Sequence, residues 1–264
     1  MTSGSSASSD APKGSLGRQY HIKVAPGEIG GVALMPGDPF RVQLIADKLQ
    51  DPVEVAHARE YRTVVGSYKG MQVTAMSTGI GCPSAAIAVE ELARCGVHTF
   101  IRVGSTAALQ AEIEVGDLVV NTGTFRNDGT SLAYAPLGYP AVPDTELTTA
   151  LTLVAREAAQ SLGVRMHVGI NVSDDAFYAE GPEWLGRMTA LGLLNVEMES
   201  SAVFTIARLR GLRGLRAGMI CGVSGNLATG DAEYGAEENP RLATSWEHSI
   251  DIALEAAHRL ESSA

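Results

Sequence analysis

Short apolar runs alternate with longer amphipathic stretches along most of the chain. The runs are rich in β-branched or other apolar residues and end in glycine or polar residues, which is typical of strands bounded by turns. On this pattern we predict seven strands, at residues 31–36, 71–77, 99–103, 117–121, 166–173, 193–197 and 217–223.

The stretches between these runs place apolar residues at helical spacing. Pro83 suits a first helical turn, and residues 85–95 follow with apolar positions on one face. Asp144 predicts the N-cap of a helix that runs to Leu162, and Gly163 predicts its end. Further helices are predicted at residues 200–209 and 241–260.

Strands that alternate with helices predict an α/β fold with a mostly buried sheet. No internal repeat or low-complexity linker interrupts the alternation, so we predict one folded domain over residues 18–264. Residues 1–17 are mostly Ser, Gly, Ala and Pro, which predicts a disordered tail. In such folds, the loops that leave the carboxyl ends of strands carry the chemistry.

Composition narrows the classes of function. The chain has 264 residues, of which 45% are hydrophobic and 19% charged, enough to bury a sizeable core. The net charge of −10 argues against binding to nucleic acid or an anionic membrane through bulk charge, although a few local arginines can still hold an anionic substrate. No apolar run reaches about 18 residues, and no signal peptide is recognisable, so we expect neither a membrane span nor secretion.

The chain has three cysteines, Cys82, Cys95 and Cys221, and no CxxC pair. An odd number of cysteines without a CxxC pair does not indicate a disulfide framework. The simplest interpretation is a protein of the reducing cytoplasm.

The first loop with candidate chemistry is Met-Pro-Gly-Asp-Pro-Phe-Arg at residues 35–41, between a predicted strand and a helix. Gly37 allows a ligand to approach the backbone, and the free N–H groups of a helix start attract anions. We expect Arg41 one turn into the helix, within reach of the same anion. An ordinary strand-to-helix turn is an equally good interpretation of the loop alone.

The second loop continues the strand at 99–103 as Gly-Ser-Thr. Arg102 stands in an otherwise apolar strand, where an unpaired charge is costly to bury. An anion at the end of the strand would satisfy Arg102, with the hydroxyls of Ser105 and Thr106 adding hydrogen bonds. The alternative is a structural salt bridge to a core carboxylate, and the adjacent Gly-Ser-Thr favours the anion.

The third loop, Ser-Thr-Gly-Ile-Gly-Cys-Pro-Ser at residues 77–84, is a glycine-rich turn into a helix and a weak signal by itself. No basic residue lies near Cys82 in sequence, so we interpret Cys82 as a packing residue rather than a nucleophile.

The fourth loop carries Glu197, Met198 and Glu199 at a predicted strand-to-helix junction. Two carboxylates can clamp the neighbouring hydroxyls of a sugar. The alternative is a pair of solvated acids that favour the helix dipole, but the apolar surroundings favour a functional role.

Other signals are weak or missing. His21 and Arg59 remain unassigned from sequence physics alone, since lone residues of these types usually lie on the surface. The remaining histidines show no HxxxH spacing, so no catalytic metal site is predicted. Neither a GxSxG motif nor a P-loop occurs.

Taken in order, these loops resemble the nucleoside phosphorylase-I family, and within it most closely the bacterial uridine phosphorylases. The resemblance extends from about His21 to the C-terminal helix. It is carried by PGDPFR (36–41), AREY (58–61), STGIGCPSAAIAVEELARCGV (77–97), FIRVGST (100–106), SLAYAPLGYPAV (131–142) and NVEMES (195–200).

The resemblance implies a three-layer α/β/α sandwich around a mixed, distorted central sheet. It implies a pentosyltransferase, in which a nucleoside and inorganic phosphate give a free base and a (deoxy)ribose 1-phosphate. Phosphate is a co-substrate, and no organic cofactor is expected. Subunits of the family form dimers that usually assemble into hexamers.

The resemblance also assigns residues. Gly37, Arg41, Arg102 and Ser105 would hold phosphate, with Arg59 supplied by the neighbouring subunit. Met198 and Glu199 would hold the ribose hydroxyls near Glu197, Thr106 would line the sugar, and His21 would reach the 5′-hydroxyl across the dimer. Of these, Arg102, Glu199 and His21 are the predicted catalytic residues. Glu60, Ile80 and Ser84 match positions that hold a structural monovalent cation such as K⁺ in the family.

The base-binding half departs from the family pattern. Phe177 is present, but the Gln-x-Arg motif that follows it in uridine phosphorylases is absent. Leu227 replaces a second arginine, and Gly225 stands where purine-cleaving relatives carry an aspartate. Without replacement partners, a polar base would lose several hydrogen bonds. Candidate replacements are Ser224, Asn226, Glu180 and Asp231.

Three functions therefore stay open: a phosphorylase with altered base preference, purine or modified bases included, a hydrolytic nucleosidase of the same superfamily, and a non-catalytic nucleoside-binding protein. The retained Arg41, Arg59 and Arg102 favour the phosphorylase, since hydrolases of this group do not need the full set of phosphate ligands.

Overall fold

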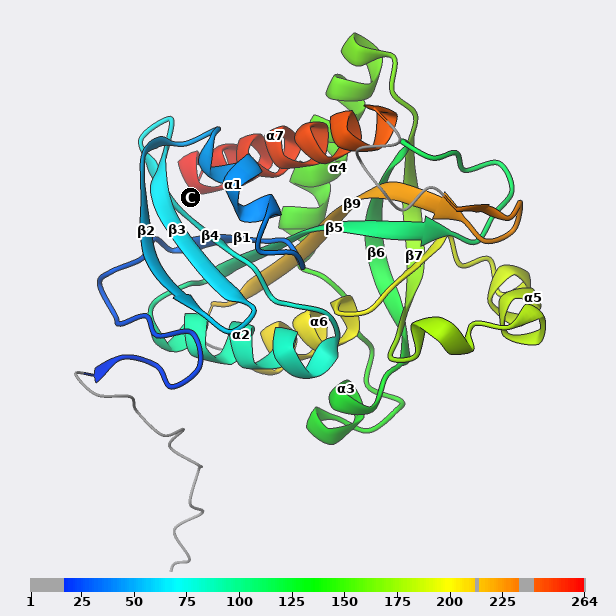
Figure 1. Cartoon of the computed structure of the whole chain (residues 1–264), viewed down its shortest axis with the longest axis horizontal. Helices are drawn as coiled ribbons and strands as arrows, with labels where there is room; N and C mark the ends of the chain where they lie inside the picture. The colour runs from blue at the N-terminus through cyan, green and yellow to red at the C-terminus, as the bar shows by residue number, and fades with distance from the viewer. Residues whose placement is uncertain (1–16, 212–213, 233–239, 264) are drawn as a thin grey trace, which may run out of the picture.

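The computed structural model describes residues 17–211, 214–232 and 240–263. Within these residues, ten strands form one mixed sheet in the order β10-β9-β6-β7-β8-β5-β1-β4-β3-β2 (Figure 1). The strands are β1 (Val32–Met35), β2 (Gln50–Ala58), β3 (Tyr61–Tyr68), β4 (Met71–Met76), β5 (Thr99–Ala108), β6 (Leu118–Asn127), β7 (Met166–Asp174), β8 (Asn195–Glu197), β9 (Arg216–Asn226) and β10 (Asp231–Ala232).

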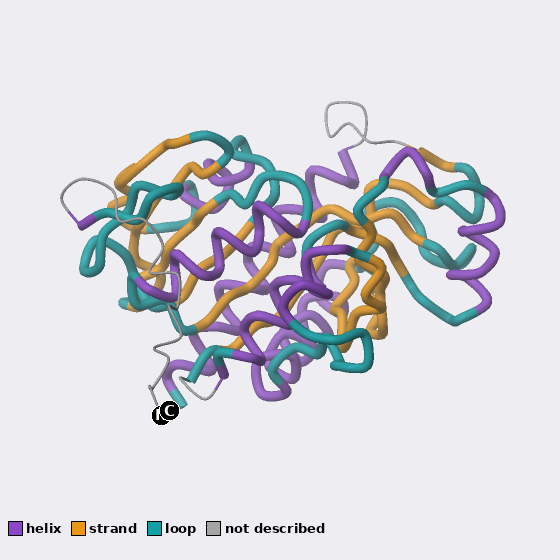
Figure 2. The backbone as a smooth tube through the Cα atoms, turned by 90° about the horizontal axis from the view of Figure 1, so that it is seen from below, coloured by secondary structure: helices purple, strands orange, loops and turns teal. Residues whose placement is uncertain are grey.

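The helices are α1 (Arg41–Ala46), α2 (Cys82–Arg94), α3 (Gly129–Tyr134), α4 (Thr145–Leu162), α5 (Pro182–Ala190), α6 (Ser200–Leu209) and α7 (Pro240–Ser262), with a 3-10 turn, η2, at Phe177–Ala179. Five of these helices pack in two separate apolar cores. Helices α2 and α6 pack in one core on one face of the sheet, and α1, α4 and α7 pack in another on the opposite face (Figure 1). Figure 2 shows, at right angles, helices lying around the strands. The predicted α/β/α sandwich is confirmed.

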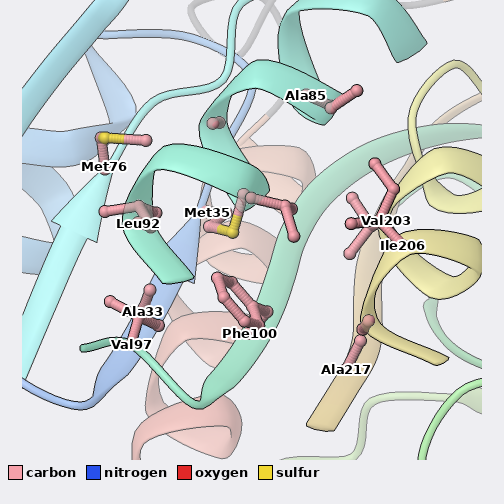
Figure 3. Packing of buried hydrophobic residues seen from close by; sticks show 14 of the residues in the cluster. Ala33, Met35, Met76, Ala85, Leu92, Val97, Phe100, Val203, Ile206 and Ala217 are labelled. Carbon is pink, nitrogen blue, oxygen red and sulfur yellow. The ribbon is translucent and has the colours of Figure 1, made fainter. Parts of the chain in front are cut away.

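The first core shows why the apolar runs of the sequence become central strands. Met35 of β1 and Phe100 of β5 are fully buried and belong to the same cluster as Leu92 of α2 and Ile206 of α6 (Figure 3). A strand covered on both faces needs apolar residues at successive positions, which is the pattern of residues 31–36 and 99–103.

Part of the sheet closes on itself. Strand β9 pairs with both β5 and β6, and β7 and β8 complete a ring of five strands, β5-β8-β7-β6-β9. In this ring, β5, β6 and β9 continue past the strand ends predicted at residues 103, 121 and 223. The added segments contain glycine and hydroxyl residues, which the apolar pattern does not mark as strand. A bulge in the β5–β9 ladder between Thr106 and Ala107 bends this extension.

The hairpin β2–β3 lies outside the sequence prediction. Strand β2 is the edge of the sheet and is mostly exposed, so its residues Gln-Asp-Pro-Val-Glu-Val-Ala-His-Ala carry no apolar run. An exposed edge strand with charges and a proline is how proteins avoid edge-to-edge pairing. The short elements β10, α3 and α5 were also not predicted.

Helix boundaries follow the predicted capping residues. The Asp144 side chain accepts a hydrogen bond from Leu147 N, and Gly163 ends α4 with a left-handed φ of 66°. Pro83 lies in the first turn of α2. One expectation is wrong: Arg41 is the first residue of α1, not one turn inside it.

The predicted tail falls outside the described residues except for residue 17. Within the described ranges, no helix combines the length and the apolar character that a bilayer crossing requires.

The N-cap of α4 provides a test of the fold. Replacing Asp144 by Ala removes the acceptor for Leu147 N, so we expect the free energy of unfolding to fall by about 1 kcal/mol. The Asp144→Asn variant keeps a capping oxygen and should lose much less. Urea denaturation of the three proteins measures both values, and equal losses for Ala and Asn would contradict the capping role.

Candidate active site

A cavity of about 600 Å³ opens where β1, β4, β5 and β8 end. The loop from β1 to α1, the loop from β4 to α2 and the start of α6 contribute its walls. The lining residues are Gly37, Asp38, Pro39, Arg41, Glu60, Gly79, Ile80, Arg102, Ser105, Thr106, Ala107, Phe177, Glu180, Val196, Glu197, Met198, Glu199 and Ser224. Segments far apart in sequence thus meet in one place.

Arg102 of β5 is the most buried cation on this wall, with 4% of the residue exposed. Its Nε donates to Glu197 Oε2 at 2.7 Å, and its Nη2 forms an ion pair with Glu199. Its Nη1 is buried and has no hydrogen-bond partner within the described chain. Burial opposes the charge, yet Glu199 and Glu197 raise the pKa of Arg102. One guanidinium nitrogen is therefore left for a ligand.

Gly104 makes room for this guanidinium. A Cβ at that position would lie 3.1 Å from Cζ and Nη2 of Arg102 and 3.1 Å from Sγ of Cys221. Glycine in the middle of a strand costs conformational entropy, and here it marks a close approach. The glycine of the Gly-Ser-Thr sequence is thus explained by the space that the Arg102 side chain needs.

Glu197 is held by many donors. Its carboxylate accepts hydrogen bonds from Nδ2 of Asn171, from the backbone N of Glu199, and from both the N and the Oγ of Ser200. These last groups belong to the first turn of α6, so Glu197 satisfies the open end of that helix and holds Arg102 at the same time.

Glu199 bridges two parts of the wall. Its Oε1 accepts a 2.6 Å hydrogen bond from Gly81 N, in the loop before α2, and its Oε2 pairs with Arg102. Gly81 adopts a φ of 96°, a conformation that favours glycine. Burial and the nearby Glu197 raise the pKa of Glu199. Both predicted acids are therefore buried groups, and the interpretation of them as solvated helix-start acids is wrong.

Arg41 is the second cation of the cavity. Its guanidinium lies 5.0 Å from the ring centre of Trp246, and no carboxylate of the described residues is within 4.0 Å of its nitrogens. Burial and the positive charge of Arg102 lower the pKa of Arg41 to about 10. Arg41, which has no carboxylate partner among the described residues, and the unpartnered Nη1 of Arg102 together offer donors that suit an anion.

Comparison with known proteins identifies the family. The sequence model described as the phosphorylase superfamily matches residues 32–259. The chain belongs to the phosphorylase superfamily. The family predicted from the loop motifs is thereby confirmed.

The relatives match over nearly their full length. A guanosine phosphorylase from Halorubrum lacusprofundi is 46% identical, covering 90% of this chain and 96% of the relative. A uridine phosphorylase from Escherichia coli is 42% identical, covering 91% and 97%. The crystal structure of uridine phosphorylase from Vibrio fischeri superposes with a TM-score of 0.81 at 34% identity, covering 92% and 98%. The chain thus falls in the activity class of nucleoside phosphorylases, which are pentosyltransferases.

Most predicted site residues meet in the cavity. The predicted phosphate ligands that line it are Gly37, Arg41, Arg102 and Ser105, and the other predicted residues there are Glu60, Ile80, Thr106, Phe177, Glu180, Glu197, Met198, Glu199 and Ser224. Thr106 donates to Val196 O at 2.6 Å, and Ser224 donates to Thr106 O at 3.2 Å. Ser105 makes no side-chain hydrogen bond to any described residue.

His21 and Arg59 lie away from the cavity wall of their own chain. Both backbone and Nδ1 contacts tie His21 to the buried Glu91, with Nδ1 2.7 Å from Oε1. Arg59 is exposed in the turn between β2 and β3, at a φ of 57°. The roles predicted for both residues require a second subunit.

Two candidate base contacts are also absent from the wall. The Asn226 amide donates to Gln110 O and Ile113 O, and its oxygen accepts from the backbone N of Ala228 and Thr229. With its hydrogen bonds used in this way, Asn226 caps a turn, and its position does not support a contact with the base. Asp231 pairs with Thr229 Oγ1 and is likewise outside.

The predicted cation ligands gather around one loop. A Cβ on Gly79 would touch Glu60 Cγ at 2.6 Å and Ser84 Oγ at 3.4 Å, and Ser84 Oγ donates to Ile80 O at 3.2 Å. Among the described residues, no group of three or more His, Cys, Asp or Glu side chains is arranged to hold a metal.

Cys82 behaves as predicted. It is fully buried, its Sγ contacts Ser201 Oγ at 3.2 Å, and burial raises the pKa of its thiol, so the nucleophilic thiolate is disfavoured.

Sequence reasoning did not single out the polar groups behind the wall. Asn171 of β7 holds Glu197, and Asn195 Nδ2 donates to Thr106 Oγ1 at 2.9 Å. A buried amide in a strand was the available signal, since such groups require partners. Trp246, which supports Arg41 from α7, gave no local signal.

The buried ionic cluster predicts a pH-dependent loss of stability. In an Arg102→Met variant, Glu197 and Glu199 lose their counter-charge, which costs roughly 3–5 kcal/mol when both stay ionised. Proton uptake by Glu199 relieves part of this cost, because its pKa is already above the ordinary 4.5. The folded state then binds more protons than the unfolded state, so the loss grows as pH rises.

Urea denaturation at about pH 5.5 and about pH 8 tests this, with the larger loss expected at the higher pH. Arg102→Lys, which keeps the charge, is the control. A loss of equal size at both pH values would contradict the account.

Proposed function

We propose that this protein is a phosphate-dependent nucleoside phosphorylase that releases the base of a ribo- or deoxyribonucleoside and forms a pentose 1-phosphate. One observation carries the proposal. Among the described residues, the buried Nη1 of Arg102 has no hydrogen-bond partner, and Arg41, on the same cavity wall, has no ion-pair partner. Inorganic phosphate supplies the missing acceptors for both.

The reaction needs positioning and electrostatics rather than a covalent nucleophile. The bond from C1′ to the base nitrogen breaks, and its electron pair leaves with the base, which takes up a proton. A phosphate oxygen then forms the new bond to C1′. Phosphate held by Arg41 and Arg102 stabilises the positive charge that builds on the pentose ring, and Gly37 and Ser105 complete the phosphate site.

The sugar lies between the phosphate and the base. Glu199 and Met198 hold its hydroxyls, and Thr106 lines its other side. Because Gly81 and Arg102 engage Glu199, its carboxylate has a fixed direction. The carboxylate oxygens of Glu197 already accept hydrogen bonds from α6, Asn171 and Arg102. We therefore assign Glu197, which lies in the ribose site, the role of positioning Arg102.

Two observations favour the phosphorylase over a hydrolytic nucleosidase and over a non-catalytic binding protein. The unpartnered guanidinium donor of Arg102 and the unpaired Arg41 suit the oxygens of a phosphate, whereas a hydrolase needs no anion at this place. The relatives that this chain covers to 96–97% of their length at 42–46% identity are phosphorylases.

The active assembly is a homodimer, itself part of a hexamer. The neighbouring subunit contributes Arg59 to the phosphate and His21 to the 5′-hydroxyl. Glu91 holds Nδ1 of His21, which leaves Nε2 for that contact. A structural monovalent cation such as K⁺ binds at Glu60, Ile80 and Ser84, near the subunit boundary.

Phosphate dependence is the direct test of the function. A panel of purine and pyrimidine nucleosides, incubated with and without phosphate, should release base only with phosphate, and a pentose 1-phosphate should form in equal amount. Base release in phosphate-free buffer would support a hydrolase, and binding without turnover of any nucleoside would support a non-catalytic protein.

Mixing two inactive variants tests the shared site. Arg41→Ala removes a phosphate ligand from a subunit's own cavity, and Arg59→Ala removes one from its neighbour's cavity. Each variant alone should be nearly inactive. In a mixed dimer, one site carries both defects and the other carries neither, so co-refolded equal amounts should regain about a quarter of the wild-type activity.

The exposed Arg156 of α4 provides the control. Its Ala variant should stay fully active, and mixing it with Arg41→Ala should give the sum of the two separate activities. Absence of any regained activity in the Arg41→Ala and Arg59→Ala mixture would contradict a site shared between subunits.

A further inference from the structure

The base end of the cavity has a carboxylate without a hydrogen-bond or ion-pair partner among the described residues. Glu180 follows η2, is half-buried, and lines the cavity together with Phe177. Its side chain forms no ion pair and no hydrogen bond with any residue that the structure describes. An acceptor-only group left open at a ligand site points to a ligand that brings donors.

The surroundings of Glu180 do not neutralise it. Asp174, at the end of β7, is the charged neighbour, and its own oxygens accept from Trp184 Nε1 at 3.0 Å and from Ala176 N at 2.8 Å. Burial and the charge of Asp174 raise the pKa of Glu180 to about 7. The cations of the cavity, Arg41 and Arg102, are not within 4.0 Å of Glu180 and form no ion pair with it. With a pKa of about 7, the carboxyl group is partly ionised at neutral pH, and its oxygens can accept hydrogen bonds from a ligand.

The other polar group at this end offers little to a base. Ser224 uses its hydroxyl proton on Thr106 O. Among the residues that the structure describes, neither an arginine nor a glutamine lines this part of the wall. Recognition of the base edge therefore depends on Glu180, with the ring of Phe177 beside it.

A carboxylate distinguishes bases by their donors. Guanine carries two adjacent donors, the N1–H and the 2-amino group, which match the two oxygens of one carboxylate. Uracil carries a single N–H between two carbonyl oxygens, and at least one of these oxygens would face the carboxylate and be repelled. Hypoxanthine has the N1–H but lacks the amino group.

We propose that Glu180 is the specificity-determining residue of the site and selects nucleosides of a 2-amino-6-oxopurine, guanosine being the simplest, over those of uracil. The proposal rests on the proposed phosphorylase function and adds the class of base. Both carboxylate oxygens accept from the Watson–Crick edge of the purine, while the phosphate and ribose ends act as described above.

The test compares guanosine, inosine and uridine as substrates of the wild-type protein and of Glu180→Gln. The amide keeps the size and one acceptor, but its NH₂ meets the 2-amino group, so kcat/KM for guanosine should fall about 10- to 100-fold, the loss expected for a hydrogen bond to a charged group. Inosine should lose less. The amide also pairs with an N–H and an adjacent carbonyl, so kcat/KM for uridine should rise or hold.

Glu183→Gln is the matched control, since Glu183 is an exposed acid of α5 and does not line the cavity. It should leave the guanosine-to-uridine ratio unchanged.

The pH profile adds an independent readout. Glu180 must be ionised to accept two hydrogen bonds, so kcat/KM for guanosine should rise as pH rises through about 7. The co-substrate phosphate also loses a proton in this pH range, but this change affects the assays of wild type and Glu180→Gln equally. The difference between the profiles of wild type and Glu180→Gln therefore reports the carboxylate.

Failure of this proposal is distinguishable from failure of the phosphorylase function. Phosphate-dependent cleavage with uridine preferred by the wild type, or with an unchanged guanosine-to-uridine ratio in Glu180→Gln, overturns the role of Glu180 and leaves the phosphorylase standing. Without phosphate-dependent turnover, calorimetric titration with guanine and uracil decides the base preference directly. Equal binding of both bases, or equal guanine binding by wild type and Glu180→Gln, also overturns it.

Discussion

Arg102 is a fixed positive charge inside an apolar sheet, and the surrounding structure depends on how that charge is compensated. Two of its three nitrogens are satisfied by Glu197 and Glu199, and the third has no partner among the described residues. The two carboxylates are themselves anchored, one to the first turn of α6 and the other to the loop before α2. Strand β5, helix α6 and the loop before α2 are therefore held together by one ionic cluster, and the same cluster leaves one buried donor of a cavity-lining arginine without a partner among the described residues.

Local compensation explains how a chain with a net charge of −10 holds an anion. Bulk charge acts at long range and is screened, whereas Arg41 and Arg102 lie on the wall of one cavity and act at contact. Burial, and after it the positive charge of Arg102, lower the pKa of Arg41, and the repulsion between the two cations is relieved when an anion binds between them. A bound anion would thus remove an unfavourable repulsion between the two cations.

The sequence was most informative where a local rule applied. Apolar runs located the central strands, Asp144 and Gly163 located both ends of α4, and the loop motifs named residues that the fold brings to one cavity. It was least informative where long-range pairing decides. The exposed edge strand β2 and the polar extensions of β5 and β9 form because of their neighbours in the sheet, and no window of the sequence contains those neighbours.

The same limit applied to the site. Asn226 and Glu180 were comparable candidates for the base from sequence, and only the fold separates a turn-capping amide from an open carboxylate. His21 and Arg59 could be named through the family resemblance, yet a single chain does not bring them to the cavity, because their predicted partner is another copy.

The most direct measurement is a crystal structure of the protein grown with inorganic phosphate. The account predicts a phosphate in the cavity that accepts hydrogen bonds from Nη1 of Arg102 and from Arg41, with the Glu197 and Glu199 contacts of Arg102 retained. A phosphate bound elsewhere, with Nη1 of Arg102 still unpartnered, would contradict it.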